Sequence, residues 1–209
     1  DKNNSKKIFI SSSCNPQTID LIKTRTEPFG LELIIGNEKS DLQNISENIV
    51  CGVLSYPGTL GDIQDPSESI SQIHKKNGKA ILVCDLLALT RLKTPAELGA
   101  DIAVGSAQRF GIPMGYGGPH AAFFATKEEF KRSMPGRIIG VSVDRHGKKA
   151  YRLSLQTREQ HIRRDKATSN ICTAQALLAI ISAAFAMYHG PKGLLKIANR
   201  TSSLAKLFA

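Results

Sequence analysis

The sequence predicts an α/β fold with a mostly parallel sheet flanked by helices. Six short apolar runs are continuous rather than alternating, which is typical of strands covered on both faces. Amphipathic stretches lie between several of these runs, as in a parallel α/β sheet. The expected strands are Ile8 to Ile10, Leu31 to Ile35, Val50 to Leu54, Ala80 to Val83, Ile102 to Val104, and Ala121 to Ala125.

Helices are predicted from apolar periodicity and from the residues at their ends. Asp65 and Pro66 suit a helix start, and Gly30 and Gly78 lie where helix C-terminal glycines are found. Near the end of the chain, His189-Gly190-Pro191 separates two further helices. The expected helices are Gln17 to Phe29, Pro66 to Asn77, Lys127 to Met134, about Thr168 to Tyr188, and about Lys192 towards Ala209.

Composition excludes several classes of protein. The chain has 209 residues, of which 41% are apolar, so it is long enough for one domain or one and a half and too apolar for disorder. The polar stretch from Asp1 to Lys7 has no apolar signal core and no Arg/Ser-rich character, so the sequence is expected to be an interior piece of a longer chain. The uncharged run from Ala167 to Tyr188 is expected to be a buried helix rather than a membrane span, because it is rich in Ala and contains polar residues.

The four cysteines, Cys14, Cys51, Cys84 and Cys172, lie far apart in the sequence. They form no C-x-x-C pair, and no histidine has the spacing of a zinc ligand. Neither a disulfide framework nor a metal site is therefore expected, and a reducing compartment fits best.

Asp85 is the first candidate site residue. It follows a buried strand, and ligands of open parallel sheets bind outside the carboxyl ends of the strands. A helix N-cap or turn aspartate is the alternative interpretation. The stretch from Gly105 to His120 holds five glycines and two prolines, which indicates a loop whose backbone approaches a ligand or another chain closely.

Positive charge is concentrated between Lys131 and Lys166. This stretch has eleven Lys and Arg against three acidic residues, so it carries +8 of the net charge of +10. Such a concentration attracts acidic partners. Nucleic acid is a possible partner, but the stretch has one aromatic residue, Tyr151, and no nucleic-acid motif. A solvated face remains the alternative.

Several long motifs closely resemble the glycine decarboxylase P-protein family of the glycine cleavage system. The resemblance covers nearly the whole chain and is carried by Ala100 to Ile102, Gly105 to Gly111, Gly115 to Phe123, Met134 to Arg137, and Gln156 to Thr173. The segments Pro113 to Tyr116 and Ile138 to Asp144 are most similar to plant mitochondrial forms.

The resemblance implies the pyridoxal-phosphate-dependent transferase fold of the aspartate-aminotransferase type (fold-type I). Residues 1–165 would be part of the large domain of the first of two tandem halves, and residues 166–209 would lead into its small domain. The implied reaction decarboxylates glycine and transfers the aminomethyl group to the lipoyl arm of the H-protein. The implied complete enzyme is a homodimer without a membrane or nucleic-acid partner, mitochondrial in plants and animals and cytoplasmic in bacteria.

The resemblance also assigns site residues. Asp85 matches the acidic partner of the pyridinium nitrogen, whereas Gln108 falls at the position of the Schiff-base lysine, so this half is expected to be non-catalytic and structural. Thr168, Ser169 and Asn170 are expected to bind the cofactor phosphate of the other half. The residues expected to dock the acidic H-protein are Arg132, Arg137, Lys148 and Arg152.

Two departures from the family pattern and two alternatives remain. Asn15 stands where the family usually has a histidine, and the strands before Tyr56 and Asp85 are each one residue short. A one-residue change exchanges the faces of a strand unless a bulge absorbs it, so a rearranged sheet is expected there. The alternative functions are an independent pyridoxal-phosphate enzyme using another lysine, such as Lys166, and a basic nucleic-acid-binding protein.

Overall fold

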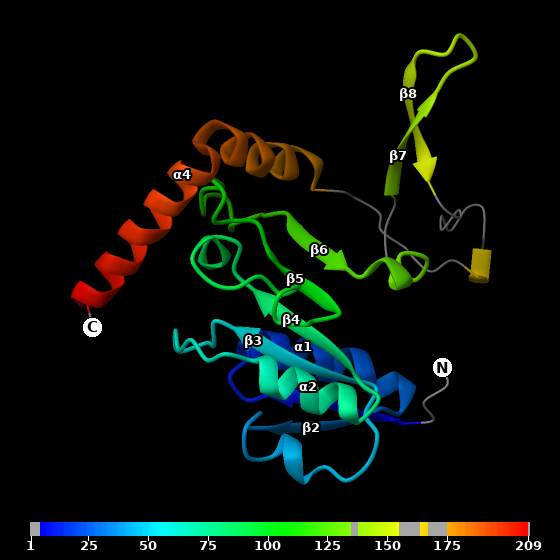
Figure 1. Cartoon of the computed structure of the whole chain (residues 1–209), viewed down its shortest axis with the longest axis vertical. Coiled ribbons are helices and arrows are strands. Elements are labelled where there is room, and N and C mark those ends of the chain that lie inside the picture. The colour runs from blue at the N-terminus through cyan, green and yellow to red at the C-terminus, as the bar shows by residue number, and fades with distance from the viewer. Residues whose placement is uncertain (1–4, 135–137, 155–163, 167–174, 209) are drawn as a thin grey trace. The chain divides into compact units, whose positions relative to one another are not determined.

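The computed structural model describes residues 5–134, 138–154, 164–166 and 175–208. The chain forms two compact units, one of residues 1–125 with 175–209 and the other of residues 126–174. Figure 1 shows the elements of each unit. The division of the chain into domains at residue 165 stays a prediction.

The first unit is built on a six-stranded sheet with the order β2-β1-β3-β4-β5-β6. The pairs β1–β2, β1–β3, β3–β4 and β4–β5 are parallel. All six predicted strands are confirmed, with ends that differ from the prediction by at most two residues. The strands are β1 Lys7–Ser11, β2 Glu32–Gly36, β3 Cys51–Tyr56, β4 Lys79–Cys84, β5 Ile102–Ser106 and β6 Ala122–Thr126.

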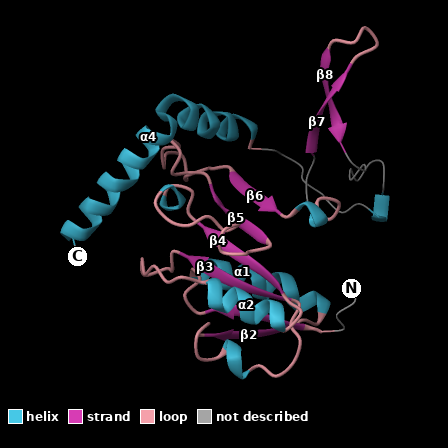
Figure 2. Cartoon of the chain, in the orientation of Figure 1, coloured by secondary structure: helices cyan, strands magenta, loops and turns pink. Residues whose placement is uncertain are grey.

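Helices cover the sheet on two faces, as the continuous apolar runs predict (Figure 2). On one face Phe9 and Leu82 pack with Ile73 of helix α2, Ser67–Lys75. On the other face Ile10 belongs to a second cluster that includes Ile22 of helix α1, Pro16–Thr26. Successive strand residues point to opposite faces, so continuous apolar sequence is needed to supply both clusters.

The pairing of β3 with β4 is regular, and the rearrangement expected relative to the family stays a prediction. Six consecutive residue pairs join these strands, from Cys51 opposite Lys79 to Tyr56 opposite Cys84, without a bulge. Tyr56 is buried in the core cluster of this face. Because the register is uninterrupted, the alternation of faces reaches the residue before Asp85 intact.

The ends of α1 and α2 agree with the prediction to within two residues, but Pro66 rather than Asp65 is the N-cap of α2, and Gly78 does not end that helix. A 3-10 turn, Glu27–Phe29, extends α1, and Gly30 ends it with a φ of 61°. At the end of α2 the left-handed residue is Asn77, with a φ of 56°. Gly78 is needed for a different reason: a Cβ atom there would lie 2.7 Å from Cγ1 of the buried Ile49.

The predicted helix from Lys127 to Met134 is wrong. This segment forms only a 3-10 turn, Glu128–Phe130, followed by further turns. None of its residues is buried. Without packing, an eight-residue segment gains too few hydrogen bonds to offset the cost of helix nucleation.

The second unit contains an antiparallel hairpin that the sequence analysis did not predict. Its strands are β7, Ile138–Val143, and β8, Lys149–Ser154. Asp144 closes the turn, because its Oδ1 accepts hydrogen bonds from the backbone N–H groups of His146 at 2.8 Å and Lys148 at 2.9 Å.

Helix α4 spans Ala176–Phe208 and is interrupted at Gly190, whose φ of 59° and ψ of −178° are not helical. The predicted break at Gly190-Pro191 is thus confirmed, and the predicted start at Thr168 lies outside the described residues. The expectation of a buried helix is wrong: Leu177 is 67% exposed and Met187 77%. No helix in the described part of the chain is long and apolar enough to cross a membrane.

Asp65 provides a test of the start of α2. Hydrogen bonds from the Ser67 hydroxyl and backbone N–H, together with Lys93, lower the pKa of Asp65 from 3.8 to about 2. Because the folded-state pKa is depressed, the contribution of this carboxylate to stability is complete above pH 4 and is lost as the pH falls towards 2. Carboxyl-carbon NMR titration should give this midpoint.

Ser67→Ala should raise the Asp65 pKa more than Lys93→Gln does, because the Ser67 hydrogen bonds are the larger cause. An Asp65 midpoint near 3.8 in the unsubstituted protein would contradict this account of the helix start.

Candidate functional site

The candidate site lies at the carboxyl ends of β4 and β5. Asp85 directly follows β4, and its Oδ1 accepts a hydrogen bond of 2.7 Å from the Ala88 N–H. Ala88 is the first residue of the 3-10 turn η3, Ala88–Thr90. The other oxygen, Oδ2, accepts a hydrogen bond of 2.9 Å from Nη1 of Arg109. Asp85 therefore caps a turn, as in the alternative interpretation, and also forms an ion pair.

Gly105 permits this ion pair. A Cβ atom at Gly105 would lie 2.1 Å from the Cys84 carbonyl oxygen and 2.6 Å from a ring carbon of Phe123. Only a residue without a side chain lets the end of β5 approach the end of β4 so closely. Arg109, three residues beyond β5, is thereby brought to Asp85.

Gln108 lies beside this ion pair in the sequence. Its backbone N–H donates to the Ser106 hydroxyl at 3.1 Å, and its Nε2 donates to the Gly118 carbonyl at 3.3 Å. The side chain thus holds the glycine-rich loop to the end of β5. A neutral amide in this position has no amine that could attack a carbonyl carbon.

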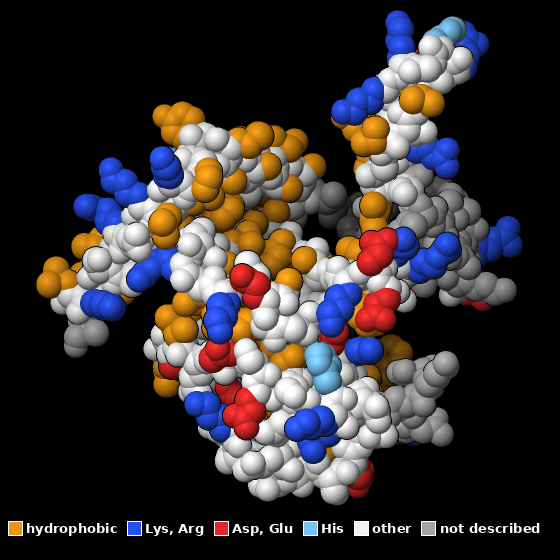
Figure 3. All heavy atoms as spheres, in the orientation of Figure 1, with side chains coloured by type: hydrophobic (Ala, Val, Ile, Leu, Met, Phe, Trp, Pro, Cys, Tyr) orange, Lys and Arg blue, Asp and Glu red, His pale blue; other side chains and the backbone are white. Residues whose placement is uncertain are grey.

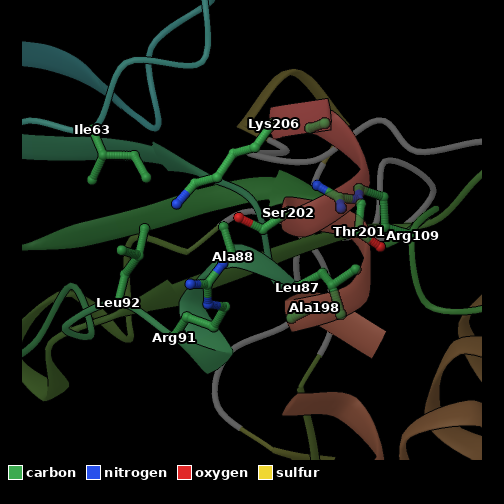
Figure 4. A pocket seen from close by; sticks show the side chains of 11 residues that line it. Ile63, Leu87, Ala88, Arg91, Leu92, Arg109, Ala198, Thr201, Ser202 and Lys206 are labelled. Atoms are coloured by element: carbon green, nitrogen blue, oxygen red, sulfur yellow. The ribbon is translucent and has the colours of Figure 1, made fainter. Parts of the chain in front are cut away.

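A pocket of about 320 Å³ opens beside the ion pair, between η3 and the C-terminal part of α4 (Figure 4). Arg109 lines it, together with cationic, hydroxyl and apolar side chains from both elements. The lining residues are Ile63, Leu87, Ala88, Arg91, Leu92, Arg109, Ala198, Thr201, Ser202, Ala205 and Lys206.

The basic residues expected to dock a partner lie in the second unit, where described. Lys148 precedes β8 and Arg152 lies within it, and both are exposed. Arg132 is also exposed and follows the 3-10 turn η4, Glu128–Phe130. Figure 3 shows Lys and Arg side chains gathered over the hairpin. The remaining predicted site residues, Arg137, Thr168, Ser169 and Asn170, lie outside the described residues.

The described cysteines are unreactive by environment. Burial raises the pKa of the Cys14 and Cys84 thiols to about 12 and that of Cys51 to about 11. Nucleophilic attack and metal binding require the thiolate, which is scarce at neutral pH with such pKa values. Within the described residues, no group of three or more potential ligands is placed to hold a metal ion.

The role of Arg109 was not predicted from the sequence. The available signal was an arginine immediately after Gln108, in a loop that follows a strand end. Its partner is 24 positions away, however, so only the pairing of β4 with β5 identifies the contact.

Comparison with known proteins identifies the family. The family model for the glycine cleavage system P-protein matches residues 1–209. The chain belongs to the P-protein family. It is 76% identical to glycine dehydrogenase (decarboxylating) of Pelagibacter ubique and 61% identical to the mitochondrial B form of Flaveria pringlei. Both alignments cover 100% of this chain, but only 22% and 20% of those proteins, so the chain spans about a fifth of their length.

Solved structures agree with this P-protein assignment. A crystal structure of glycine decarboxylase (P-protein) in inhibitor-bound form matches with a TM-score of 0.86 and 35% identity over 93% of this chain and 45% of that chain. An apo cysteine desulfurase from Thermococcus onnurineus matches with a TM-score of 0.60 and 18% identity, over 97% and 50% of the two chains, and so shows the fold alone. The predicted fold-type I large-domain class is confirmed.

Gly105→Ala should disrupt the site. The added methyl group meets backbone that cannot move cheaply, so we expect destabilisation of about 1–3 kcal/mol or more by urea denaturation, together with loss of the Asp85–Arg109 contact. Gly115→Ala is the matched control, because a Cβ atom there meets nothing within 4 Å. Equal effects of the two substitutions would contradict the role of the close approach.

Proposed function

We propose that this chain is part of the half of a glycine decarboxylase P-protein that does not hold the cofactor covalently. The complete protein decarboxylates glycine and transfers the aminomethyl group to the lipoyl arm of the H-protein. The proposal is carried by Gln108, which the family resemblance assigns to the position of the Schiff-base lysine, in a chain whose match to the family covers all 209 residues. Pyridoxal phosphate is then bound mainly by the C-terminal half.

The described residues of this half do not fit pyridoxal phosphate. Gln108 provides no amine, and the Asp85 carboxylate already pairs with Arg109 and accepts the Ala88 N–H. A pyridinium nitrogen would have to displace a guanidinium with up to five donors. These contacts support a structural role for this half, as a partner of the C-terminal half and a wall of its site.

Exposed apolar surface on α4 supports the structural role. Leu177, Ile180, Met187 and Tyr188 are each more than 60% exposed. Contiguous exposed apolar patches usually mark interaction sites. We assign this face to contact with the C-terminal half of the complete protein, which forms a homodimer.

The phosphate role of Thr168, Ser169 and Asn170 is retained within this proposal. These residues combine two hydroxyls and an amide next to Lys166, a set suited to an anion. The cellular compartment of the protein depends on the organism that it comes from. The Flaveria relative is named as mitochondrial, whereas the greater identity to the Pelagibacter protein favours a bacterial, cytoplasmic enzyme.

The site of cofactor attachment tests the proposal. Borohydride reduction of the complete protein with pyridoxal phosphate, followed by peptide mass spectrometry, should place the modified lysine outside these 209 residues. Gln108→Asn should leave that labelling unchanged. A modified lysine within this chain, such as Lys166, would instead support an independent pyridoxal-phosphate enzyme. The nucleic-acid alternative finds no support in the family match.

The basic residues Arg132, Arg137, Lys148 and Arg152 are proposed to dock an acidic H-protein. Opposite charges accelerate encounter, and salt screens them with a Debye length of about 10 Å at 0.1 M. The double variant Lys148→Glu and Arg152→Glu should slow association with the H-protein several-fold at low salt, measured by stopped-flow fluorescence. Its effect should shrink as ionic strength rises.

Lys23→Glu is the control for that variant. Lys23 is exposed on α1, in the other unit, so its reversal changes net charge without touching the hairpin. An association rate that is insensitive to both salt and the double variant would leave the hairpin as a solvated face.

A further inference from the structure

We propose that the pocket between η3 and the C-terminal part of α4 binds a small amphipathic anion, a phosphate or carboxylate carried on an apolar body. This goes beyond the proposed function, because it assigns a ligand to the half that lacks the lysine. The proposal uses only residues of the first unit.

The first observation is the convergence of cations. Arg91 at the end of η3, Arg109 beyond β5 and Lys206 in the last turns of α4 come from three elements to line one pocket (Figure 4). The lining contains no Asp or Glu. Like charges gathered around one hollow repel each other, and an anion in the hollow removes that repulsion.

The second observation is the charge balance. The Arg109 charge is matched by Asp85 at 2.9 Å, and Arg109 also lines the pocket. Arg91 and Lys206 form no ion pair with any residue in the described ranges. Two uncompensated positive charges therefore remain, which fits a phosphate monoester better than a neutral ligand.

The third observation is the apolar remainder of the wall. Ile63, Leu87 and Leu92 line the pocket, with three alanines beside them. Thr201 already donates to the Ile197 carbonyl at 3.0 Å, which leaves few polar groups besides the cations. A volume of about 320 Å³ is at the lower end of the range for small-molecule sites. The cationic side chains bind the anionic group of the ligand, and the apolar side chains of the wall contact its apolar part.

Phenyl phosphate is the probe, and isothermal titration calorimetry on the complete protein is the measurement. Phenyl phosphate should bind with at least about tenfold higher affinity than either phenol or inorganic phosphate, because each control lacks one half of the recognition. Arg91→Gln and Lys206→Gln should each weaken binding about tenfold. Ala205→Phe should abolish it by filling the pocket while keeping every charge.

Arg200→Gln is the matched control, because Arg200 is an exposed cation on α4 that does not line the pocket. It should leave affinity unchanged, and thermal unfolding should show that all variants are folded. Three outcomes would overturn the proposal. The first is that phenyl phosphate does not bind, as when another segment of the complete chain fills the pocket. The second is that phenol binds with the same affinity as phenyl phosphate. The third is that Arg200→Gln and Lys206→Gln reduce the affinity for phenyl phosphate equally. The borohydride labelling of a lysine in the other half of the protein does not depend on whether this pocket binds phenyl phosphate, so the two proposals can fail separately.

Discussion

The ion pair between Asp85 and Arg109 is the interaction on which the candidate site depends. Both residues are partly exposed, with side-chain exposures of 26% and 46%, so the pair contributes about 1 kcal/mol or less to stability. Its importance is chemical rather than energetic. One Asp85 oxygen accepts a hydrogen bond from Arg109, and the other accepts one from the Ala88 N–H. Arg109 also lines the adjacent pocket.

This arrangement changes what the end of β4 can bind. A carboxylate at the carboxyl end of a parallel strand favours a cationic ligand group, but here Arg109 supplies the positive charge from within the chain. The carboxylate is neutralised, and Arg91 and Lys206 leave the adjacent pocket positive. Gln108, which offers no amine, and the internal cation Arg109 thus act in the same direction, away from a covalently held pyridinium cofactor.

The sheet was predictable because its strands are buried on both faces and therefore continuous in apolar sequence. The break in α4 was predictable because Gly190-Pro191 cannot continue a helix. Elements without buried residues were not predictable. The segment Lys127 to Met134 has the composition of a helix but no buried residue, and none of the described side chains of the hairpin β7/β8 is buried. Local sequence specifies structure best where tertiary packing agrees with it.

The candidate site was also only partly predictable from local sequence. Asp85 was identifiable because its position after a strand is a local property, whereas Arg109 acquires its role only when β5 pairs with β4. The residues that line the pocket lie even farther apart in the sequence, from Ile63 to Lys206. No sequence spacing relates such residues to one another. The sequence therefore shows the cationic ones only as part of the excess of Lys and Arg.

Exposed apolar residues place a final constraint on the fold. Ile139, Val141 and Val143 lie on one face of β7 at 60–69% exposure, and Val141 is opposite Tyr151, which is also exposed. Burying such side chains contributes about 1.5–3 kcal/mol each, and their exposure forgoes that stabilisation. The same holds for the exposed face of α4. Both surfaces gain stability only when covered, so each favours a contact that buries its apolar side chains.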